Sequence, residues 1–256
     1  MTEHIFIFGG TTEGRVLSGF AETEKIPCYV SVATEYGREV LPESMKFCRI
    51  LEGRMDGQQM IRFFRKKNIT AVIDATHPYA VEVSRNIKSA CHECGIKYLR
   101  VLRAPTPLPE SARVFPSSPA AAEFLSGTKE KILLCTGSKE LSAFAAVRGF
   151  ADRVYARMLP LESSVKAALR AGLPEKNLIL EKGPFTVQDN IRHICESGAG
   201  ILVTKDSGRE GGMPEKLEAA EKTGCLLIVI RRPEEENGIT VGEAERIILE
   251  KWGEGK

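Results

Sequence analysis

The sequence has no long hydrophobic run and no marked excess of charge of either sign. No apolar stretch approaches the roughly 20 residues that a membrane-spanning helix needs, so no membrane association is expected. The 36 basic and 34 acidic side chains leave a formal net charge of +2, which gives no reason to expect nucleic acid as a partner. With 43% hydrophobic and 27% charged residues and no biased tract, the composition is typical of a globular protein.

The sequence also shows neither a cysteine pattern typical of disulfides nor a secretory leader. The seven cysteines are an odd number scattered along the chain, and the first residues lack the basic segment of a signal peptide. Reduced thiols in a cytoplasmic protein are therefore expected. Cys91 and Cys94 have C-x-x-C spacing, but no second pair follows and both lie in a helical pattern. They are interpreted as structural, and no metal site is expected.

Short β-rich apolar runs alternate with amphipathic segments through most of the 256 residues. This rhythm is typical of parallel sheets covered by helices. Strands are expected at 5–8, 28–32, 47–51, 71–74, 98–102, 131–135, 153–158, 178–181, 201–204 and 226–230. Helices are expected at 12–23, 57–67, 80–94, 139–149, 162–171, 186–197, 214–223 and 241–251. The predicted fold class is α/β, with two Rossmann-like, doubly wound parallel-sheet domains.

A segment rich in proline and serine interrupts the alternation at 103–119, "RAPTPLPESARVFPSSP". It has no periodicity and is interpreted as the connection between the two halves. The predicted organisation is an N-terminal domain at 1–104, a linker at 105–119 and a C-terminal domain at 120–256. The last residues are expected to form a helix, because Ile247, Ile248 and Trp252 share a helical face.

Glycine, proline, hydroxyl and ionic residues gather where the predicted strands end. In open α/β sheets, ligands bind beyond the carboxyl ends of the strands, and the opposite ends of the same strands are bland by comparison. The clusters are GGTTEGR (9–15), ATHPYA (75–80), TGSK (136–139), EKGPF (181–185) and TKDSGREGG (204–212). They predict a ligand cleft between the two domains.

The first cluster follows the first strand, where mononucleotide loops occur. Gly9 and Gly10 would let backbone amides approach a phosphate, and Thr11 and Thr12 would add hydroxyl groups at a helix N-terminus. Gly14 would allow close packing of helix on strand. The spacing departs from G-x-G-x-x-G, so a plain turn capped by a threonine is the alternative.

The end of the second strand bears on the choice of cofactor. NAD usually meets an acidic residue there, whereas this strand ends in Ala33 and Thr34, with Glu35 only later. Arg15 and Arg38 lie nearby. This combination favours a 2′-phosphate, and hence NADP(H).

Two further clusters carry imidazole and cationic groups. His77 follows a strand and precedes a proline that restrains the turn, although a buried structural histidine or a helix cap is the alternative. Ser138, Lys139 and Lys182 lie at the same predicted edge. Each lysine alone is typical of a solvated surface, but together they indicate an anionic ligand.

The densest cluster is TKDSGREGG, which holds Lys205, Asp206, Ser207 and Arg209 within five residues. Capping of the next helix by Asp206 or Ser207 is the structural alternative. Two cations and an acid exceed what capping requires, and the cluster is interpreted as functional.

These motifs, in this order and followed by Lys216, resemble the precorrin-6A reductase family of cobalamin biosynthesis. The resemblance spans residues 4 to about 232. It implies two Rossmann-like domains with NADPH in the cleft, and NADPH-dependent reduction of one double bond of precorrin-6A or cobalt-precorrin-6A to give precorrin-6B. A substrate rich in carboxylates fits a cationic rim. No flavin and no protein-bound metal are implied.

The resemblance also suggests residue roles. The cofactor-binding set is Gly9, Gly10, Thr11, Thr12, Gly14, Arg15, Thr34 and Thr76. The substrate-binding set is Ser138, Lys139, Lys182, Ser207 and Arg209. Asp206 is the leading candidate to donate or relay the proton, and His77, Lys205 and bound water compete with it.

Two other classes remain open on sequence grounds. A transferase with two Rossmann-like halves would bind a nucleotide sugar or S-adenosylmethionine and not NADPH. A nucleotide-sensing protein would bind NADPH without oxidising it. The oligomeric state is not indicated.

Overall fold

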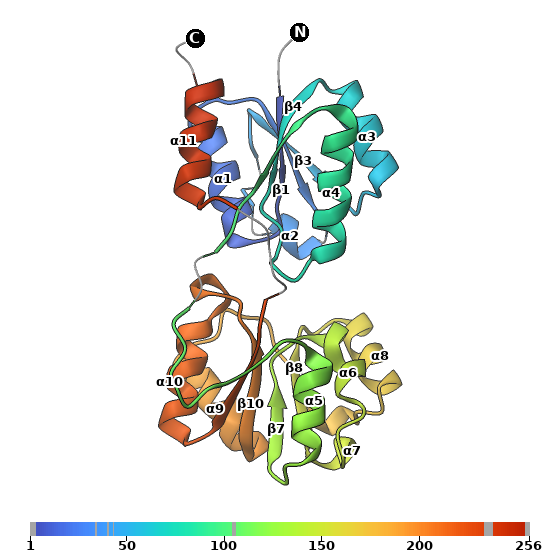
Figure 1. The fold of residues 1–256 in the computed structure, drawn as a ribbon, viewed down its shortest axis with the longest axis vertical. Coiled ribbons are helices and arrows are strands. Elements are labelled where there is room, and N and C mark those ends of the chain that lie inside the picture. Colours follow the sequence, from blue (N-terminus) through green and yellow to red (C-terminus); the bar gives the residue numbers. More distant parts are fainter. Residues whose placement is uncertain are drawn as a thin grey trace. The chain divides into compact units, whose positions relative to one another are not determined.

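The computed structural model describes residues 4–33, 35–39, 41–42, 44–103, 106–232 and 238–253. The chain divides into two compact units, each built on one parallel sheet (Figure 1). Unit 1 comprises Met1–Arg103 with Pro233–Lys256, and unit 2 comprises Ala104–Arg232. Both units have helices against their sheets, which is the α/β class that the alternation predicts.

Unit 1 has five strands in the order β3-β2-β1-β4-β5, all parallel. Its elements along the chain are β1 (His4–Phe8), α1 (Thr12–Thr23), β2 (Cys28–Val32), α2 (Glu35–Glu39), β3 (Cys48–Glu52), α3 (Gly57–Lys66), β4 (Ile69–Asp74), α4 (Val81–Cys94), β5 (Lys97–Arg100) and α11 (Val241–Trp252). The order reverses at β1, so the first βα turn lies where nucleotide ligands bind in this class of sheet.

Two apolar layers hold the helices of unit 1 on opposite faces of the sheet. Ile5 and Ile7 of β1 face α1 and α11, whereas Phe6 and Phe8 face α3 and α4. This division follows from the alternation of side chains along a strand. All four side chains are at most 4% exposed.

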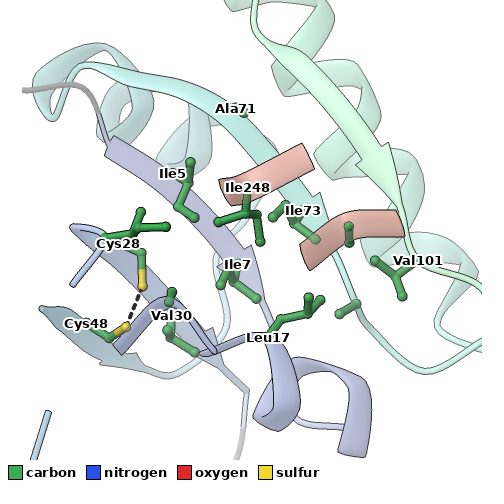
Figure 2. Packing of buried hydrophobic residues seen from close by; sticks show 14 of the residues in the cluster. Ile5, Ile7, Leu17, Cys28, Val30, Cys48, Ala71, Ile73, Val101 and Ile248 are labelled. Atoms are coloured by element: carbon green, nitrogen blue, oxygen red, sulfur yellow. Dashed lines mark hydrogen bonds between the residues drawn. The ribbon is translucent and has the colours of Figure 1, made fainter. Parts of the chain in front are cut away.

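The C-terminal segment belongs to unit 1, which corrects the predicted domain of 120–256. Ile239 extends the sheet through a bridge to Val101, and α11 packs beside α1. Figure 2 shows Ile248 of α11 among the side chains of the central strands. The predicted helical face is confirmed, since Ile247, Ile248 and Trp252 all pack against this core. The segment was predicted to belong to the C-terminal domain because it follows that domain in the sequence. Burial of its apolar face in the unit 1 core shows that α11 belongs to unit 1.

Unit 2 has six strands in the order β6-β11-β10-β7-β8-β9, again all parallel. Its elements are β6 (Arg113–Phe115), α5 (Ser118–Ser126), β7 (Lys131–Leu134), η1 (Ser138–Glu140), α6 (Leu141–Phe144), α7 (Phe150–Arg153), β8 (Val154–Met158), α8 (Glu162–Arg170), η2 (Glu175–Asn177), β9 (Leu178–Leu180), α9 (Val187–Ser197), β10 (Ala199–Lys205), η3 (Arg209–Gly211), α10 (Met213–Thr223) and β11 (Leu226–Ile230).

The predicted linker at 105–119 needs a second correction. Within it, β6 pairs with β11 and α5 begins at Ser118, capped by the Ser117 hydroxyl. The three residues of β6 are too few and too exposed to show a pattern in the sequence. The single helix predicted at 139–149 is also wrong: η1 and α6 end by Phe144, and Gly149 adopts a left-handed φ of 71° before α7.

The described helices include none with both the length and the apolar character that a bilayer-spanning segment needs. Cys91 and Cys94 lie in α4, and Cys91 is in the core against α3. Burial raises the pKa of the Cys91 thiol to about 12, which suits a packing residue. All seven cysteines are free, and the Cys28 and Cys48 sulfur atoms of neighbouring strands lie 2.7 Å apart (Figure 2).

Candidate functional site

The turn after β1 depends on two of its three glycines. Gly10 has a φ of +89°, a conformation that favours glycine. A Cβ on Gly14 would lie 2.5 Å from the Cα of Gly9, so only glycine allows α1 to approach the turn this closely. Gly9 has ordinary space around it, and its amide donates to the Ser31 carbonyl at 2.8 Å. The turn thus presents bare backbone at the start of a 12-residue helix.

The two threonines of this turn have different surroundings. Thr11 caps α1 by accepting from the Gly14 amide at 3.1 Å, and its hydroxyl donates to the Ala75 carbonyl at 2.6 Å. The Thr11 side chain therefore ties the turn to β4. Among the described residues, the Thr12 hydroxyl and the Arg15 guanidinium have no hydrogen-bond partner, and Arg15 is exposed. The Thr11 side chain thus caps the helix, and the Thr12 and Arg15 side chains lie at the same turn without a partner in the described part of the chain.

A buried ion pair supports the same turn and was not expected from the sequence. Arg103 Nε and Nη2 donate to the two Glu13 carboxylate oxygens at 2.5 and 2.7 Å. Both side chains are at most 7% exposed. Burial by itself would raise the pKa of Glu13, but the hydrogen bonds and charge of Arg103 outweigh it and hold the pKa below its ordinary value. Ninety positions separate the partners, so no local pattern reveals the pair.

Asp74 organises the end of β4 and was also missed. Its fully buried carboxylate accepts from Arg100 Nη1 at 3.0 Å, from the Tyr98 hydroxyl at 2.9 Å and from the Thr76 hydroxyl at 2.6 Å. Thr76, predicted to bind cofactor, therefore has its hydroxyl directed at Asp74. Burial first, and then the Asp74 charge, raise the pKa of Tyr98. An acidic residue ending an apolar strand was the available signal.

His77 lies just beyond this network and is exposed, so the alternative of a buried structural histidine is wrong. Its Nδ1 accepts from the Tyr79 amide at 3.3 Å, and the two rings contact one another at 5.7 Å between centroids. The imidazole therefore belongs to the turn before α4, at the same strand edge as the glycine turn. That edge is the one predicted for it.

The end of β2 is only partly described. Thr34, predicted to bind cofactor, lies outside the described residues. Arg38 on α2 forms an ion pair with Glu52 at 3.4 Å and donates to the Pro42 carbonyl at 3.1 Å. These contacts engage the Arg38 guanidinium, whereas the Arg15 guanidinium has no partner among the described residues.

In unit 2, the TGSK turn is joined to the end of β10 by an ion pair. Lys205 Nζ lies 3.0 Å from Glu140 Oε1, and the Ser118 hydroxyl donates to the other oxygen at 2.6 Å. Burial would raise the pKa of Glu140, but the Ser118 and Lys205 hydrogen bonds lower it overall. Ser138 is half-buried and Lys139 is exposed. The structure thus places Lys205 at the predicted strand edge, where it forms an ion pair with Glu140.

The TKDSGREGG segment folds back on itself. Asp206 pairs with Arg232, whose Nε lies 3.1 Å from Oδ2 and whose Nη2 lies 3.2 Å from Oδ1. The Ser207 hydroxyl donates to the Gly211 carbonyl at 3.0 Å. Arg209 is exposed and has no partner in the described part of the chain. Neither Asp206 nor Ser207 caps α10, so the alternative of a simple helix cap is wrong.

Lys182 is exposed in the EKGPF segment, which contains a cis peptide bond between Gly183 and Pro184. Sequence reasoning gave no role to Arg157 of β8, a buried cation that lies 3.8 Å from the Phe185 ring centroid of this segment. Among the described residues, no group of His, Cys, Asp and Glu side chains is arranged to hold a metal ion.

Each unit, taken by itself, therefore gathers polar residues at the carboxyl ends of its parallel strands. In unit 1 they surround a glycine turn at the switch in strand order. In unit 2 they combine exposed cations with ion pairs.

Comparison with known proteins gives a consistent result over the whole chain. Residues 4–249 match the family model described as Precorrin-6x reductase CbiJ/CobK. Cobalt-precorrin-6A reductase of Priestia megaterium is 31% identical over 95% of this chain and 96% of its own length. Precorrin-6A reductase of Mycobacterium tuberculosis strain H37Rv is 30% identical over 90% of this chain and 88% of its own. The solved structure of CobK precorrin-6A reductase superposes with a TM-score of 0.76 at 24% identity, covering 97% of each chain, which supports the fold.

Proposed function

The chain belongs to the Precorrin-6x reductase CbiJ/CobK family, and from this premise we propose that it reduces one double bond of precorrin-6A or cobalt-precorrin-6A with NADPH. The product would be precorrin-6B or its cobalt form, in cobalamin biosynthesis. The observation that carries the proposal is the match of residues 4–249 to the family, together with relatives that align over nearly their full length. A biosynthetic enzyme of this kind is expected in the cytoplasm.

The glycine turn of unit 1 fits a dinucleotide phosphate. Gly10 and Gly14 keep side chains away from the backbone at the start of α1, where amide donors and the helix dipole attract anions. Thr12 can add a hydroxyl group and Arg15 a charge. Thr11 serves by holding the turn on β4 rather than by direct contact. When bound, the cofactor would supply the hydride, and these residues would bind and orient it.

The substrate side of the proposal rests on unit 2. Lys139, Lys182 and Arg209 are exposed cations at the carboxyl edge of its sheet, and Ser138 and Ser207 are the neighbouring hydroxyl residues. A macrocycle bearing many carboxylates would be attracted by such a set. We keep these five residues as the substrate-binding candidates.

The proton that completes the reduction needs a donor near the acceptor carbon. Asp206 remains our first candidate, but it would have to exchange its contact with Arg232 for one with substrate. Lys205 would likewise have to leave Glu140. His77 is exposed, and acceptance of the Tyr79 amide at Nδ1 places the proton of the neutral ring on Nε2.

The test is to mix the purified protein with NADPH and precorrin-6A, with and without cobalt, and to follow the nicotinamide absorbance. We expect oxidation of NADPH only when the acceptor is present, with much slower oxidation of NADH. Arg15→Ala should raise the NADPH dissociation constant about tenfold, the loss of roughly one charge-assisted hydrogen bond. Exposed Arg62 on α3 is the matched control, and Arg62→Ala should bind NADPH normally.

Other outcomes would identify the rival classes. NADPH binding without oxidation would indicate a sensor, and absence of NADPH binding with affinity for a nucleotide sugar or S-adenosylmethionine would indicate a transferase. Equal rates with NADH and NADPH would contradict the assignment of the 2′-phosphate.

A further inference from the structure

One face of the unit 2 sheet carries buried polar groups that the proposed roles leave unused. Leu133, Tyr155 and Leu202 pack in a single core with α9 and α10. Since alternate residues of a strand share a face, Arg157 and Thr204 project toward the same two helices near the carboxyl ends of β8 and β10. Arg157 is 6% exposed and Thr204 is 1% exposed.

Arg157 has neutral partners only. Its Nη1 donates to Asn190 Oδ1 at 2.9 Å and contacts His193 Nδ1 at 3.0 Å. Because the guanidinium donates, His193 Nδ1 must accept, and Nε2 then donates to Glu181 at 3.1 Å. Burial is the main cause that lowers the pKa of His193, and a neutral ring agrees with this arrangement.

No carboxylate in the described part of the chain lies within ion-pair distance of Arg157. Glu181 is reached only through His193, and it already binds both terminal nitrogens of Arg192 at 3.1 and 3.0 Å. Arg157 Nε and Nη2 lack acceptors among the described residues, yet neither is among the fully buried unpaired atoms. These two nitrogen atoms of Arg157 are therefore accessible to solvent.

Lys216, in the first turns of α10, is a second buried cation, 7% exposed. Its ammonium donates to the Gly211 and Gly212 carbonyls at 2.7 and 3.1 Å, which leaves its third N–H unused. Glu215 is the acidic neighbour on the same helix, but no ion pair joins the two, and Glu215 Oε2 is itself buried without a partner. Burial, with the charge of Arg157 adding to it, lowers the pKa of Lys216 to about 8.

Two cations that repel each other on one buried face are costly unless an anion joins them. Their unused donors make no hydrogen bond to a described residue, and the fork of an arginine matches the two oxygens of a carboxylate or phosphate. Phe185 fixes the plane of the guanidinium from one side. These features point to a bound oxyanion.

We infer that Arg157 and Lys216 form an oxyanion-binding site at the carboxyl edge of the unit 2 sheet. The inference rests on the proposed function for the source of the anion, which is a carboxylate of the tetrapyrrole or a phosphate of the cofactor. It adds two buried specificity-determining residues to the exposed cations of unit 2.

The first arm of the test uses inorganic phosphate and citrate as probes on the free protein. Each should raise the melting temperature of the wild type, and the increase should fall at least by half in Lys216→Met and in Arg157→Lys, which keeps the charge but loses the fork. Lys222→Met is the control, because Lys222 is an exposed lysine of the same helix. An increase that is unchanged in both site variants overturns the inference, even if the variants start from a lower melting temperature.

The second arm distinguishes the two sources. The constants are measured for Lys216→Met and Arg157→Lys and compared with those of the wild type. A rise of about tenfold or more in KM for precorrin-6A, with the NADPH dissociation constant unchanged, identifies a substrate carboxylate. A similar rise in the NADPH dissociation constant alone identifies a cofactor phosphate. Unchanged constants for both ligands contradict the site. Failure of the wild type to oxidise NADPH would refute the proposed function, whereas the phosphate and citrate arm would still decide the site.

Discussion

At the scale of single residues, buried charges are the main feature of this protein. Glu13 with Arg103, and Asp74 with Arg100, are paired through short hydrogen bonds. Breaking such a pair costs about 3–5 kcal/mol, because one charge is left buried alone. Arg157 and Lys216 differ from these pairs, since neither contacts a carboxylate in the described residues.

Lys216 makes the stability of the protein depend on pH in an unusual direction. Its pKa is about 8 in the folded chain, below the ordinary value of roughly 10.4 that the unfolded chain has. Between these values the unfolded state binds more protons, so the free energy of unfolding should rise with pH. The expected gain is on the order of 3 kcal/mol from about pH 8 to about pH 10.

Urea denaturation of the wild type and of Lys216→Met across this range measures the effect. The free energy of unfolding of the wild type should rise with pH relative to that of Lys216→Met, because the variant lacks the titrating group. Parallel curves for wild type and variant would rule out the titration of Lys216 as the cause. Cys135 and Arg157 are the other groups that influence this lysine, besides Glu215.

At the scale of elements, the sheets were the most predictable part. Short apolar runs were sufficient to predict strands. The five-residue runs 28–32 and 226–230 are buried strands with the predicted bounds. Helices with a clear apolar face and a cap, such as α1, were also found. The short β6 and the broken helix after β7 were not, because their residues show neither period over a sufficient length.

The candidate site followed the same rule. Clusters at strand ends could be located because chain order and the parallel sheet place them there. The partners inside each cluster could not, since Arg103, Arg232 and Glu140 come from distant segments. Arg157 was missed because a single cation within an apolar strand has no local signature.

The helix α11 provides a test of the packing of unit 1. Ile248 is fully buried, whereas its neighbour Leu249 is 46% exposed. Ile248→Ala should lower the free energy of unfolding by about 2–5 kcal/mol through the lost apolar contact and the cavity. Leu249→Ala should change it by no more than about 0.5 kcal/mol. Thermal or urea unfolding checks both, and equal effects would contradict the placement of α11.

At the scale of the whole molecule, the two units differ in how the chain builds them. Unit 2 is one continuous segment, Ala104–Arg232, with its own core, whereas unit 1 needs residues from both ends of the chain. We expect the isolated segment 106–232 to fold, because every strand of its sheet is present.

The segment 1–103 is expected to remain unfolded or to aggregate, because without α11 it exposes apolar side chains such as Leu17 and Ile5. Circular dichroism and cooperative thermal unfolding of the two fragments measure this difference. Addition of a peptide covering 238–253 should restore structure to the first fragment. Cooperative folding of 1–103 by itself would show that α11 is dispensable.

The late position of α11 in the chain has a consequence during translation. The first half of unit 1 leaves the ribosome long before residues 241–252 are made, and unit 2 is synthesised in the interval. Domains tend to fold in order as they emerge, yet unit 1 cannot bury the apolar face of its sheet until α11 has been synthesised. A nascent chain stalled before that point should therefore be a client of ribosome-associated chaperones.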